Sequence, residues 1–122
     1  MKTTVIVVDD DEAVRHSLEW LLKSWGYHVL GYDSATNYLR DTVRSEEPGC
    51  VILDIHMPEI NGLELYAILK KQYPDISVIF VTGYPGQILA EKARGLDSKG
   101  FFTKPLDTDE LLHCIAASVR DE

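Results

Sequence analysis

Five short runs of apolar residues recur along the chain at regular intervals. The first, third and fourth runs, at residues 4–8, 50–53 and 77–81, are apolar almost without interruption, which is typical of strands buried on both faces of a parallel sheet. The second run, YHVLGY at 27–32, mixes apolar and polar residues, and the fifth, GFF at 100–102, is short. We therefore predict five strands, with the second and fifth nearer the edges of the sheet.

Between these runs lie stretches whose apolar residues recur three and four positions apart, the spacing of one face of a helix. Five such stripes predict five helices, of which the fourth is the weakest and follows Tyr84-Pro85-Gly86. The residues predicted to face inward are Val14, Leu18, Leu21, Leu22 and Trp25; Ala35, Tyr38, Leu39 and Val43; Leu65, Ile68 and Leu69; Leu89, Ala93 and Leu96; and Leu112, Ile115, Ala116 and Val119.

Residues that favour helix ends mark several boundaries. Gly26 is placed to end the first helix. Asn61 is a good N-cap, and Asp107 is another, with Glu110 three residues later as a capping box. Because strand and helix alternate five times, we predict an α/β domain with a mostly parallel sheet, right-handed crossovers and helices on both faces.

Composition limits the classes of function that remain. The chain has 122 residues, 45% hydrophobic and 26% charged, so we assign residues 1–122 to a single globular domain. Its net charge of −8 argues against a nucleic-acid surface on this domain. The apolar runs are too short to span a membrane and no export signal is visible, so we expect a cytoplasmic protein without membrane contact. Cys50 and Cys114 lie in apolar surroundings without ligand spacing, and we expect buried free thiols.

Polar side chains follow four of the predicted strands at the point where each strand ends. Asp9 and Asp10 follow the first, Asp54 the third, Thr82 the fourth and Lys104 the fifth. Singly, each residue is more often a cap, a turn former or a solvated charge. The carboxyl ends of parallel strands share one edge of a sheet, where open α/β sheets bind ligands. We therefore expect these five side chains to converge, and we assign no chemical role to the neighbouring acidic residues that begin the first helix.

Carboxylates packed this closely repel one another and raise one another's pKa values. A divalent cation relieves the repulsion, and a shell of carboxylate and water oxygens suits Mg²⁺. A carboxylate beside Mg²⁺ is also a competent nucleophile toward a phosphoryl group, with which it forms an aspartyl phosphate. Lys104 and Thr82 could then hold the phosphoryl oxygens.

With these features the sequence resembles the receiver domains of two-component response regulators, the CheY-like group. The resemblance covers essentially the whole chain and rests on VVDDDEAVR (7–15), LDIHMPEINGLEL (53–65), VTG (81–83) and FFTKP (101–105). Within the group it is most similar to the receivers of LuxR-type, FixJ-like transcriptional regulators. It implies a doubly wound five-stranded parallel sheet in the order 2-1-3-4-5.

The resemblance also implies how the acidic residues act. Asp54 is the expected phosphoacceptor, served by a sensor histidine kinase in a Mg²⁺-dependent reaction. Asp10 is expected to bind Mg²⁺ directly, with Asp54 and the backbone carbonyl of His56, while Asp9 assists partly through water. The imidazole of His56 has no ligand role in the family. The domain is therefore not expected to be an enzyme, although it assists its own phosphorylation and dephosphorylation.

Three further residues carry implied roles. Thr82 is expected to bond a phosphoryl oxygen, and Lys104 to pair with it, with a cis bond between Lys104 and Pro105. Phe101 falls at the switch aromatic, which moves inward when Thr82 is drawn toward the phosphate, although it could equally be a core phenylalanine. The implied output is a change in the face formed by the fourth helix, fifth strand and fifth helix, which controls phosphorylation-dependent homodimerisation.

Departures from the family pattern and competing interpretations remain open at this point. Asp97-Ser98 replaces the usual Gly-Ala, and Tyr84-Pro85-Gly86 is an unusual, loosened start for the fourth helix. One competing interpretation is a haloacid-dehalogenase-type phosphatase, which would need a second aspartate at the position of His56. Another is a pseudo-receiver, which would not need the acidic, hydroxyl and lysine residues that are all present here. DNA contact is expected only through a C-terminal domain absent from this chain. We expect a piece of a longer transcription factor, the alternative being a stand-alone receiver acting through protein–protein contacts.

Overall fold

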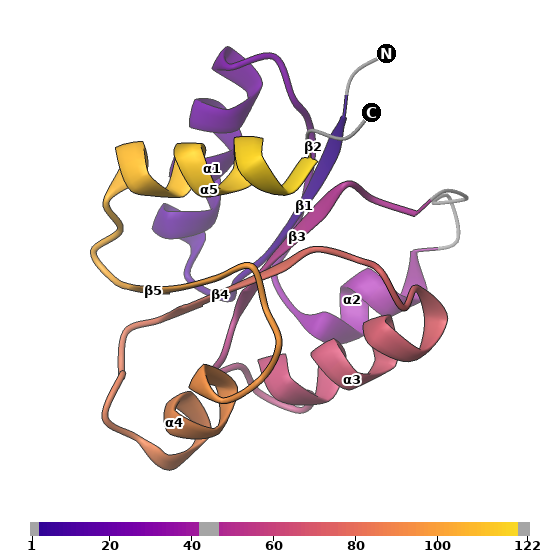
Figure 1. The fold of residues 1–122 in the computed structure, drawn as a ribbon, viewed down its shortest axis with the longest axis vertical. Coiled ribbons are helices and arrows are strands. Elements are labelled where there is room, and N and C mark those ends of the chain that lie inside the picture. Colours follow the sequence, from indigo (N-terminus) through magenta and orange to yellow (C-terminus); the bar gives the residue numbers. More distant parts are fainter. Residues whose placement is uncertain (1–2, 42–46, 120–122) are drawn as a thin grey trace.

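The computed structural model describes residues 3–41 and 47–119. Helices and strands alternate along the chain (Figure 1). Within the described ranges, no helix has the length and the apolar character needed to cross a membrane. The strands are β1 (Thr4–Val8), β2 (His28–Tyr32), β3 (Cys50–Asp54), β4 (Val78–Thr82) and β5 (Gly100–Thr103), and the helices are α1 (Glu12–Ser24), α2 (Ala35–Arg40), α3 (Gly62–Gln72), α4 (Ile88–Arg94) and α5 (Thr108–Val119).

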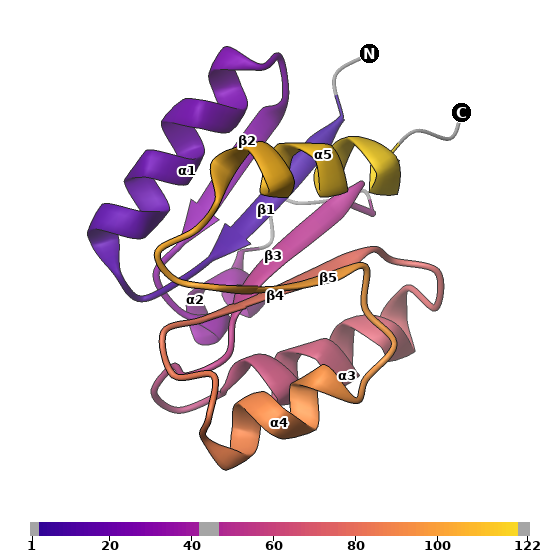
Figure 2. The same cartoon turned by 60° about the vertical axis from the view of Figure 1, so that its left-hand side comes forward.

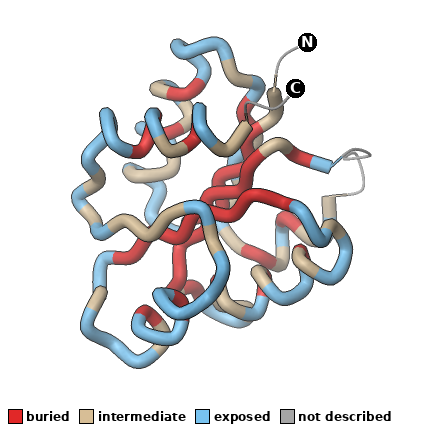
Figure 3. Tube along the Cα trace, viewed as in Figure 1, coloured by how far each residue is buried: buried red, intermediate tan, exposed pale blue. Residues whose placement is uncertain are grey.

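The strands form one parallel sheet in the order β2-β1-β3-β4-β5. The predicted order and the predicted edge positions of β2 and β5 are therefore confirmed. Every residue of the central strands β3 and β4 is buried, whereas the two edge strands have mixed exposure (Figure 3). Asp54 and Thr82 are the last residues of β3 and β4 rather than the first residues after them, so the rigidity of the sheet extends to both side chains.

Helices cover both faces of the sheet, as the alternating pattern predicts (Figures 1 and 2). One hydrophobic core lies under α2, α3 and α4 and includes Tyr38, Leu65 and Phe80. The other lies under α1 and α5 and includes Leu22 and Ile115. Because strand residues alternate between the two faces, each strand contributes to both cores and ties the two helix layers together.

The helix ends differ in how well they are capped. Asp11 caps α1 by accepting hydrogen bonds from two backbone N–H groups, and Gly26, at φ 95°, follows its last turn as predicted. Asn61 caps α3 in a reciprocal capping box with Glu64. In contrast, Gln87 precedes α4 without a side-chain cap, which agrees with the loosened start predicted there.

Some inward-facing predictions are wrong. Trp25 is exposed because it is the C-cap residue of α1 and no longer follows the helical stripe. Leu96 lies beyond the end of α4, and Ile68 and Ala116 lie at the outer rims of their helices. Leu111, which the stripe omitted, is buried, and Val43 lies outside the described residues.

The two cysteines are free, as expected, but only one is fully buried. Cys50 lies inside the sheet, where burial raises the pKa of its thiol to about 12. Cys114 is half-buried on α5, and its thiol donates a hydrogen bond to the Lys99 carbonyl oxygen. The prediction of two buried thiols therefore holds for Cys50 and is wrong for Cys114.

Candidate functional site

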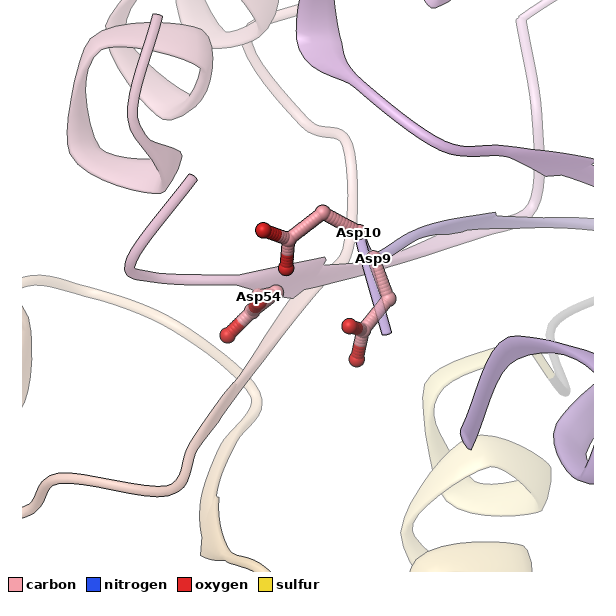
Figure 4. Close-up of side chains that lie close together, drawn as sticks. All are labelled: Asp9, Asp10 and Asp54. Atoms are coloured by element: carbon pink, nitrogen blue, oxygen red, sulfur yellow. The ribbon is translucent and has the colours of Figure 1, made fainter. Parts of the chain in front are cut away.

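Three carboxylates meet at the carboxyl edge of the sheet, as the strand ends predict (Figure 4). Asp9 and Asp10 directly follow β1, and Asp54 ends the neighbouring strand β3. One oxygen from each of the three lies within 4.8 Å of the others. Asp9 and Asp54 are buried, while Asp10 is exposed. The group therefore has a buried floor and an open side toward solvent.

Backbone contacts fix the loop that carries Asp9. Its Oδ1 accepts a hydrogen bond from the Asp11 backbone N–H at 2.8 Å. The guanidinium of Arg15, on the first turns of α1, donates to the Asp9 carbonyl oxygen at 2.8 Å. Asp11 itself is occupied in capping α1, which confirms its expected structural role. The start of α1 therefore holds the acidic pair in place, and Arg15 is a contributor that the sequence pattern did not single out.

Lys104 enters the acidic group from the end of β5. Its ammonium Nζ lies 3.1 Å from Asp9 Oδ2 and 3.6 Å from Asp54 Oδ1. Its backbone N–H donates to the Thr82 carbonyl oxygen at 2.8 Å, and the peptide bond to Pro105 is cis. The lysine thus bridges two buried carboxylates across the sheet.

Burial and mutual repulsion control the ionisation of this group. Burial is the largest influence on Asp54, and with the neighbouring Asp9 charge it raises the pKa of Asp54 to about 8, against the opposing effect of Lys104. Burial also raises the pKa of Asp9, although the Asp11 N–H and Lys104 favour its ionised form. Burial lowers the pKa of Lys104, but the two carboxylates outweigh that effect and raise it. The site thus holds more negative charge than one lysine can neutralise.

Thr82 lies on the next strand, with its hydroxyl oxygen fully buried and already engaged. Thr82 Oγ1 accepts a hydrogen bond from the Tyr84 backbone N–H at 2.9 Å and lies 3.3 Å from Nδ1 of His56. The rings of His56 and Tyr84 meet edge to face, with centroids 5.4 Å apart. Nε2 of His56 is buried and has no hydrogen-bond partner among the described residues. The two bulky side chains therefore stand together beside the hydroxyl.

Phe101 lies further from the acidic group, on β5. It is half-buried against the core under α3 and α4, and the Arg94 guanidinium carbon lies 4.3 Å from the centre of its ring. The sequence predicted Phe101 as a candidate and did not indicate Arg94. Such contacts depend on how α4 packs on β5, which no local pattern encodes.

The donor set fits a hard divalent cation. Asp9, Asp10 and Asp54 supply only oxygen atoms, and Asp10 leaves the group open to water, which suits Mg²⁺. Burial is the main cause of the raised pKa values of Asp9 and Asp54, so a positive charge beside them would favour their ionised forms. A cation here would stabilise both ionised carboxylates.

An apolar groove of about 420 Å³ adjoins the site. It runs between α1 and the segment that follows Lys104, and its lining includes Val14, Leu21, Trp20 and Leu106. Trp20 is 73% exposed at this groove. Large exposed aromatic side chains are typical of surfaces that contact other proteins.

The doubly wound sheet, with an acidic group, a hydroxyl and a lysine at its carboxyl edge, defines the class of CheY-like receivers. Residues 5–116 match the family model of the response regulator receiver domain, and the chain belongs to that family. It therefore acts in two-component signalling as a receiver domain. The match decides against the haloacid-dehalogenase interpretation.

Relatives show how the domain is used elsewhere. The response regulator protein TodT of Pseudomonas putida is 38% identical over 118 residues, which cover 97% of this chain and 52% of TodT. The transcriptional regulatory protein FixJ of Bradyrhizobium diazoefficiens is 35% identical over 119 residues, covering 98% of this chain and 58% of FixJ. The structure of the response regulator StyR superposes with a TM-score of 0.81 at 36% identity, covering 98% of this chain and 60% of that one. The chain thus spans about half the length of the curated relatives it matches.

Proposed function

We propose that Asp54 accepts a phosphoryl group from a phosphohistidine of a sensor kinase and that this modification switches the domain. The juxtaposition of Asp9, Asp10 and Asp54 oxygens within 4.8 Å, with Lys104 Nζ beside two of them, supports this proposal most strongly. Asp54 is the acceptor because it lies at the centre of this group, between the acidic pair on β1 and Thr82 on β4.

In the transfer, an Asp54 carboxylate oxygen attacks the phosphorus atom while the bond from phosphorus to the donor imidazole nitrogen breaks. The electron pair of the broken bond stays on the departing imidazole, which takes up a proton. Asp54 must be ionised to attack, and its pKa of about 8 makes the metal-free acceptor partly neutral at physiological pH. Bound Mg²⁺ would supply positive charge that favours the ionised form and neutralises phosphoryl oxygens. Asp9, Asp10 and Asp54 would hold it, with the His56 carbonyl as a further ligand.

The new phosphoryl group would be recognised by Lys104 and Thr82. It carries more charge and more acceptor oxygens than the carboxylate it replaces, and charge-assisted bonds contribute about 1.5–3 kcal/mol each. Reversal of a 1:99 equilibrium needs about 5.5 kcal/mol. Two contacts at the upper end of this range, or three near its middle, supply that difference. We therefore expect a nearly complete switch, in which Thr82 leaves His56 and Tyr84 and Phe101 moves toward the vacated space.

The switch would act through α4, β5 and α5. Tyr84 and Ile88, at the start of α4, are both large, apolar and more than half exposed, which favours an interface on this face. We infer that modification promotes homodimerisation there, and that a DNA-binding domain in a longer protein is the output, since the relative FixJ is a transcriptional regulatory protein. A stand-alone receiver that acts through protein contacts is the alternative.

Intact mass spectrometry after incubation with acetyl phosphate tests the acceptor. We expect one phosphoryl adduct that requires Mg²⁺ and is lost in Asp54→Asn. An adduct retained by that variant would place the acceptor elsewhere. No adduct on folded wild type would overturn phosphorylation and leave a pseudo-receiver that binds its partners unmodified.

A further inference from the structure

Arg94 and Phe101 form a contact that no family motif in the sequence indicates. Arg94 is the last residue of α4, and its guanidinium carbon lies 4.3 Å from the ring centre of Phe101 on the edge strand β5. Nε of Arg94 also lies 3.6 Å from the Glu91 carboxylate, one turn earlier. Arg94 is therefore held from one side by its own helix while it covers an aromatic ring on the sheet.

The ring of Phe101 and the hydroxyl of Thr82 share one face of the sheet. Phe80 pairs in register with Phe101, and Thr82 pairs with Thr103. Phe80 and Phe101 both belong to the core under α3 and α4. Since side chains two residues apart on a strand point to the same face, Thr82 also faces that side. A ring that left Arg94 and moved inward along this face would approach Thr82.

Helix α4 has little local support of its own. It spans seven residues, and Gln87 gives it no side-chain cap. Short helices of this kind depend on tertiary packing. Ala90 and Ala93 provide buried contacts to the core, and the stacking of Arg94 on Phe101 adds a contact at the far end. The position of α4 is thus coupled to the position of one ring.

We propose that Arg94 is a positioning residue that holds Phe101 in its half-buried place in the unmodified domain and so opposes the switch at Asp54. This inference rests on the proposed function. The stacking exists only while the ring lies under the guanidinium, so it stabilises the unmodified arrangement alone. A cation–π contact at a partly exposed site changes such an equilibrium by about two- to fivefold.

Beryllofluoride, which mimics a phosphoryl group on a carboxylate, provides the first test. With Mg²⁺ present, we expect Arg94→Met to bind it about two- to fivefold more tightly than wild type, and Arg94→Lys to fall between them. Lys92→Met is the matched control, because Lys92 is an exposed cation in the same helical turn. We expect that variant to match wild type or to bind more weakly.

The direction of the effect separates positioning from simple electrostatics. Removing a cation weakens the binding of an anionic ligand by Coulomb's law, so tighter binding by Arg94→Met requires release of the ring. Unchanged or weaker binding by Arg94→Met would overturn the inference. Equal tightening by Lys92→Met would overturn it as well.

Fluorine NMR provides a second test, which reports on the Phe101 ring itself. The chain has three phenylalanines, so 4-fluorophenylalanine labelling gives three resonances, and Phe101→Tyr assigns the one of interest. In Arg94→Met without ligand, we expect this resonance to shift toward its position in the beryllofluoride complex of wild type. If wild type binds no beryllofluoride, the proposed function fails. If the Phe101 resonance also does not move in Arg94→Met, the positioning role of Arg94 fails as well.

Discussion

Asp54 must meet two conflicting requirements at once. It lies at the end of a buried strand, which fixes its direction, yet in the proposed reaction it must carry a charge to act as a nucleophile. Lys104 offsets part of the cost, but it lies closer to Asp9 than to Asp54. The pKa of Asp54, raised to about 8 by burial and by Asp9, measures what remains uncompensated.

This conflict predicts how stability depends on pH. The folded-state pKa of Asp54, about 8, exceeds its ordinary value of 3.8, so Asp54 binds more protons in the folded than in the unfolded state between these values. Its contribution to metal-free stability therefore falls as pH rises through that window. Asp54→Asn removes the charge and should therefore raise the metal-free unfolding temperature at pH 8 by several degrees. Thermal unfolding in EDTA at pH 5.5 and pH 8 measures this.

Mg²⁺ serves as the control for this effect. Since a ligand of the folded state stabilises it, Mg²⁺ should raise the unfolding temperature of wild type more at pH 8 than at pH 5.5, and should do so less in Asp54→Asn. An unfolding temperature of metal-free wild type that rises with pH across the window would contradict this account of Asp54.

His56 and Tyr84 predict a slow loss of the phosphoryl group. Their rings meet edge to face beside Thr82, where we expect them to obstruct the approach of water to a phosphorylated Asp54. We expect wild type to lose its phosphoryl group over minutes or longer and a His56→Ala, Tyr84→Ala variant to lose it about tenfold faster, equivalent to about 1.4 kcal/mol of barrier. The decay of the intact-mass adduct gives both rates. Faster loss in wild type than in the double variant would refute the prediction, and Trp25→Ala, another exposed aromatic change, controls for general effects.

At the scale of single residues, the sequence predicts well the polar side chains that gather at the strand ends. It predicts poorly the other residues that hold them in place. Asp9, Asp10, Asp54, Thr82 and Lys104 were predictable because parallel strands bring their carboxyl ends to one edge. Their convergence needs no detailed knowledge of side-chain packing. The contacts of Arg15 and Arg94 depend on how a helix packs on the sheet and on the rotamer of a long side chain. Local sequence patterns determine neither.

At the scale of elements, the α3 N-terminus shows how tightly a helix can be joined to the acceptor strand. The Gly62 N–H donates to the Ile55 carbonyl oxygen at 2.9 Å. A Cβ atom at Gly62 would lie 2.5 Å from the Asp54 carbonyl oxygen and 2.9 Å from the Ile55 Cα. The family motif contains this glycine, but the sequence alone does not reveal its contact with the acceptor backbone.

Gly62→Ala should therefore destabilise the fold by moving the end of β3. Because the obstructing atoms belong to the backbone, we expect a loss of about 1–3 kcal/mol. Gly86→Ala is the matched control, since a Cβ there would meet nothing within 4 Å, and its effect should stay within about 1 kcal/mol. Urea unfolding measures both changes, and equal midpoints for the two variants would contradict the close approach at Gly62.

The strands were more predictable than the helices. Continuous apolar runs identify β1, β3 and β4 because burial on both faces leaves no polar position. The spacing of apolar residues identifies the inner face of a helix but not the residue at which the helix ends. Trp25 and Leu96 therefore fit the predicted stripes although their helices end before them. The weak prediction for α4 reflects a real physical feature, a seven-residue helix without a side-chain cap.

At the scale of the molecule, we propose that a phosphodonor protein docks in the groove between α1 and the segment after Lys104, whose lining includes Pro105, the residue that follows Lys104. Acidic residues in the first turns of α1 and α5 flank it, so a kinase surface that combines apolar and basic side chains would complement it.

Trp20→Ala should slow transfer about tenfold or more from whichever purified sensor kinase phosphorylates wild type, because exposed tryptophans often dominate such contacts. Its reaction with acetyl phosphate should not change. Trp25→Ala is an equally drastic change at the C-cap of the same helix but outside the groove. It should affect neither reaction, and equal losses in the two variants would contradict docking at the groove.

Lys104 links the site to the proposed dimer, because its ammonium lies beside Asp9 and Asp54 while its backbone N–H donates to the carbonyl oxygen of Thr82. Lys104→Ala removes the ammonium that would pair with the phosphoryl group, but Asp54 and the cation ligands remain. We therefore expect Lys104→Ala to accept a phosphoryl group from acetyl phosphate with Mg²⁺, yet to stay monomeric when modified.

Sedimentation tests this expectation on samples whose modification is verified by intact mass. The control is Lys99→Ala, a change at an exposed lysine just before β5, which should dimerise like wild type. Circular dichroism checks that the variant is folded, since removing Lys104 leaves two buried carboxylates less compensated. Dimerisation of modified Lys104→Ala to the wild-type extent would show that the signal leaves the site by another route, such as Thr82 and Phe101 alone.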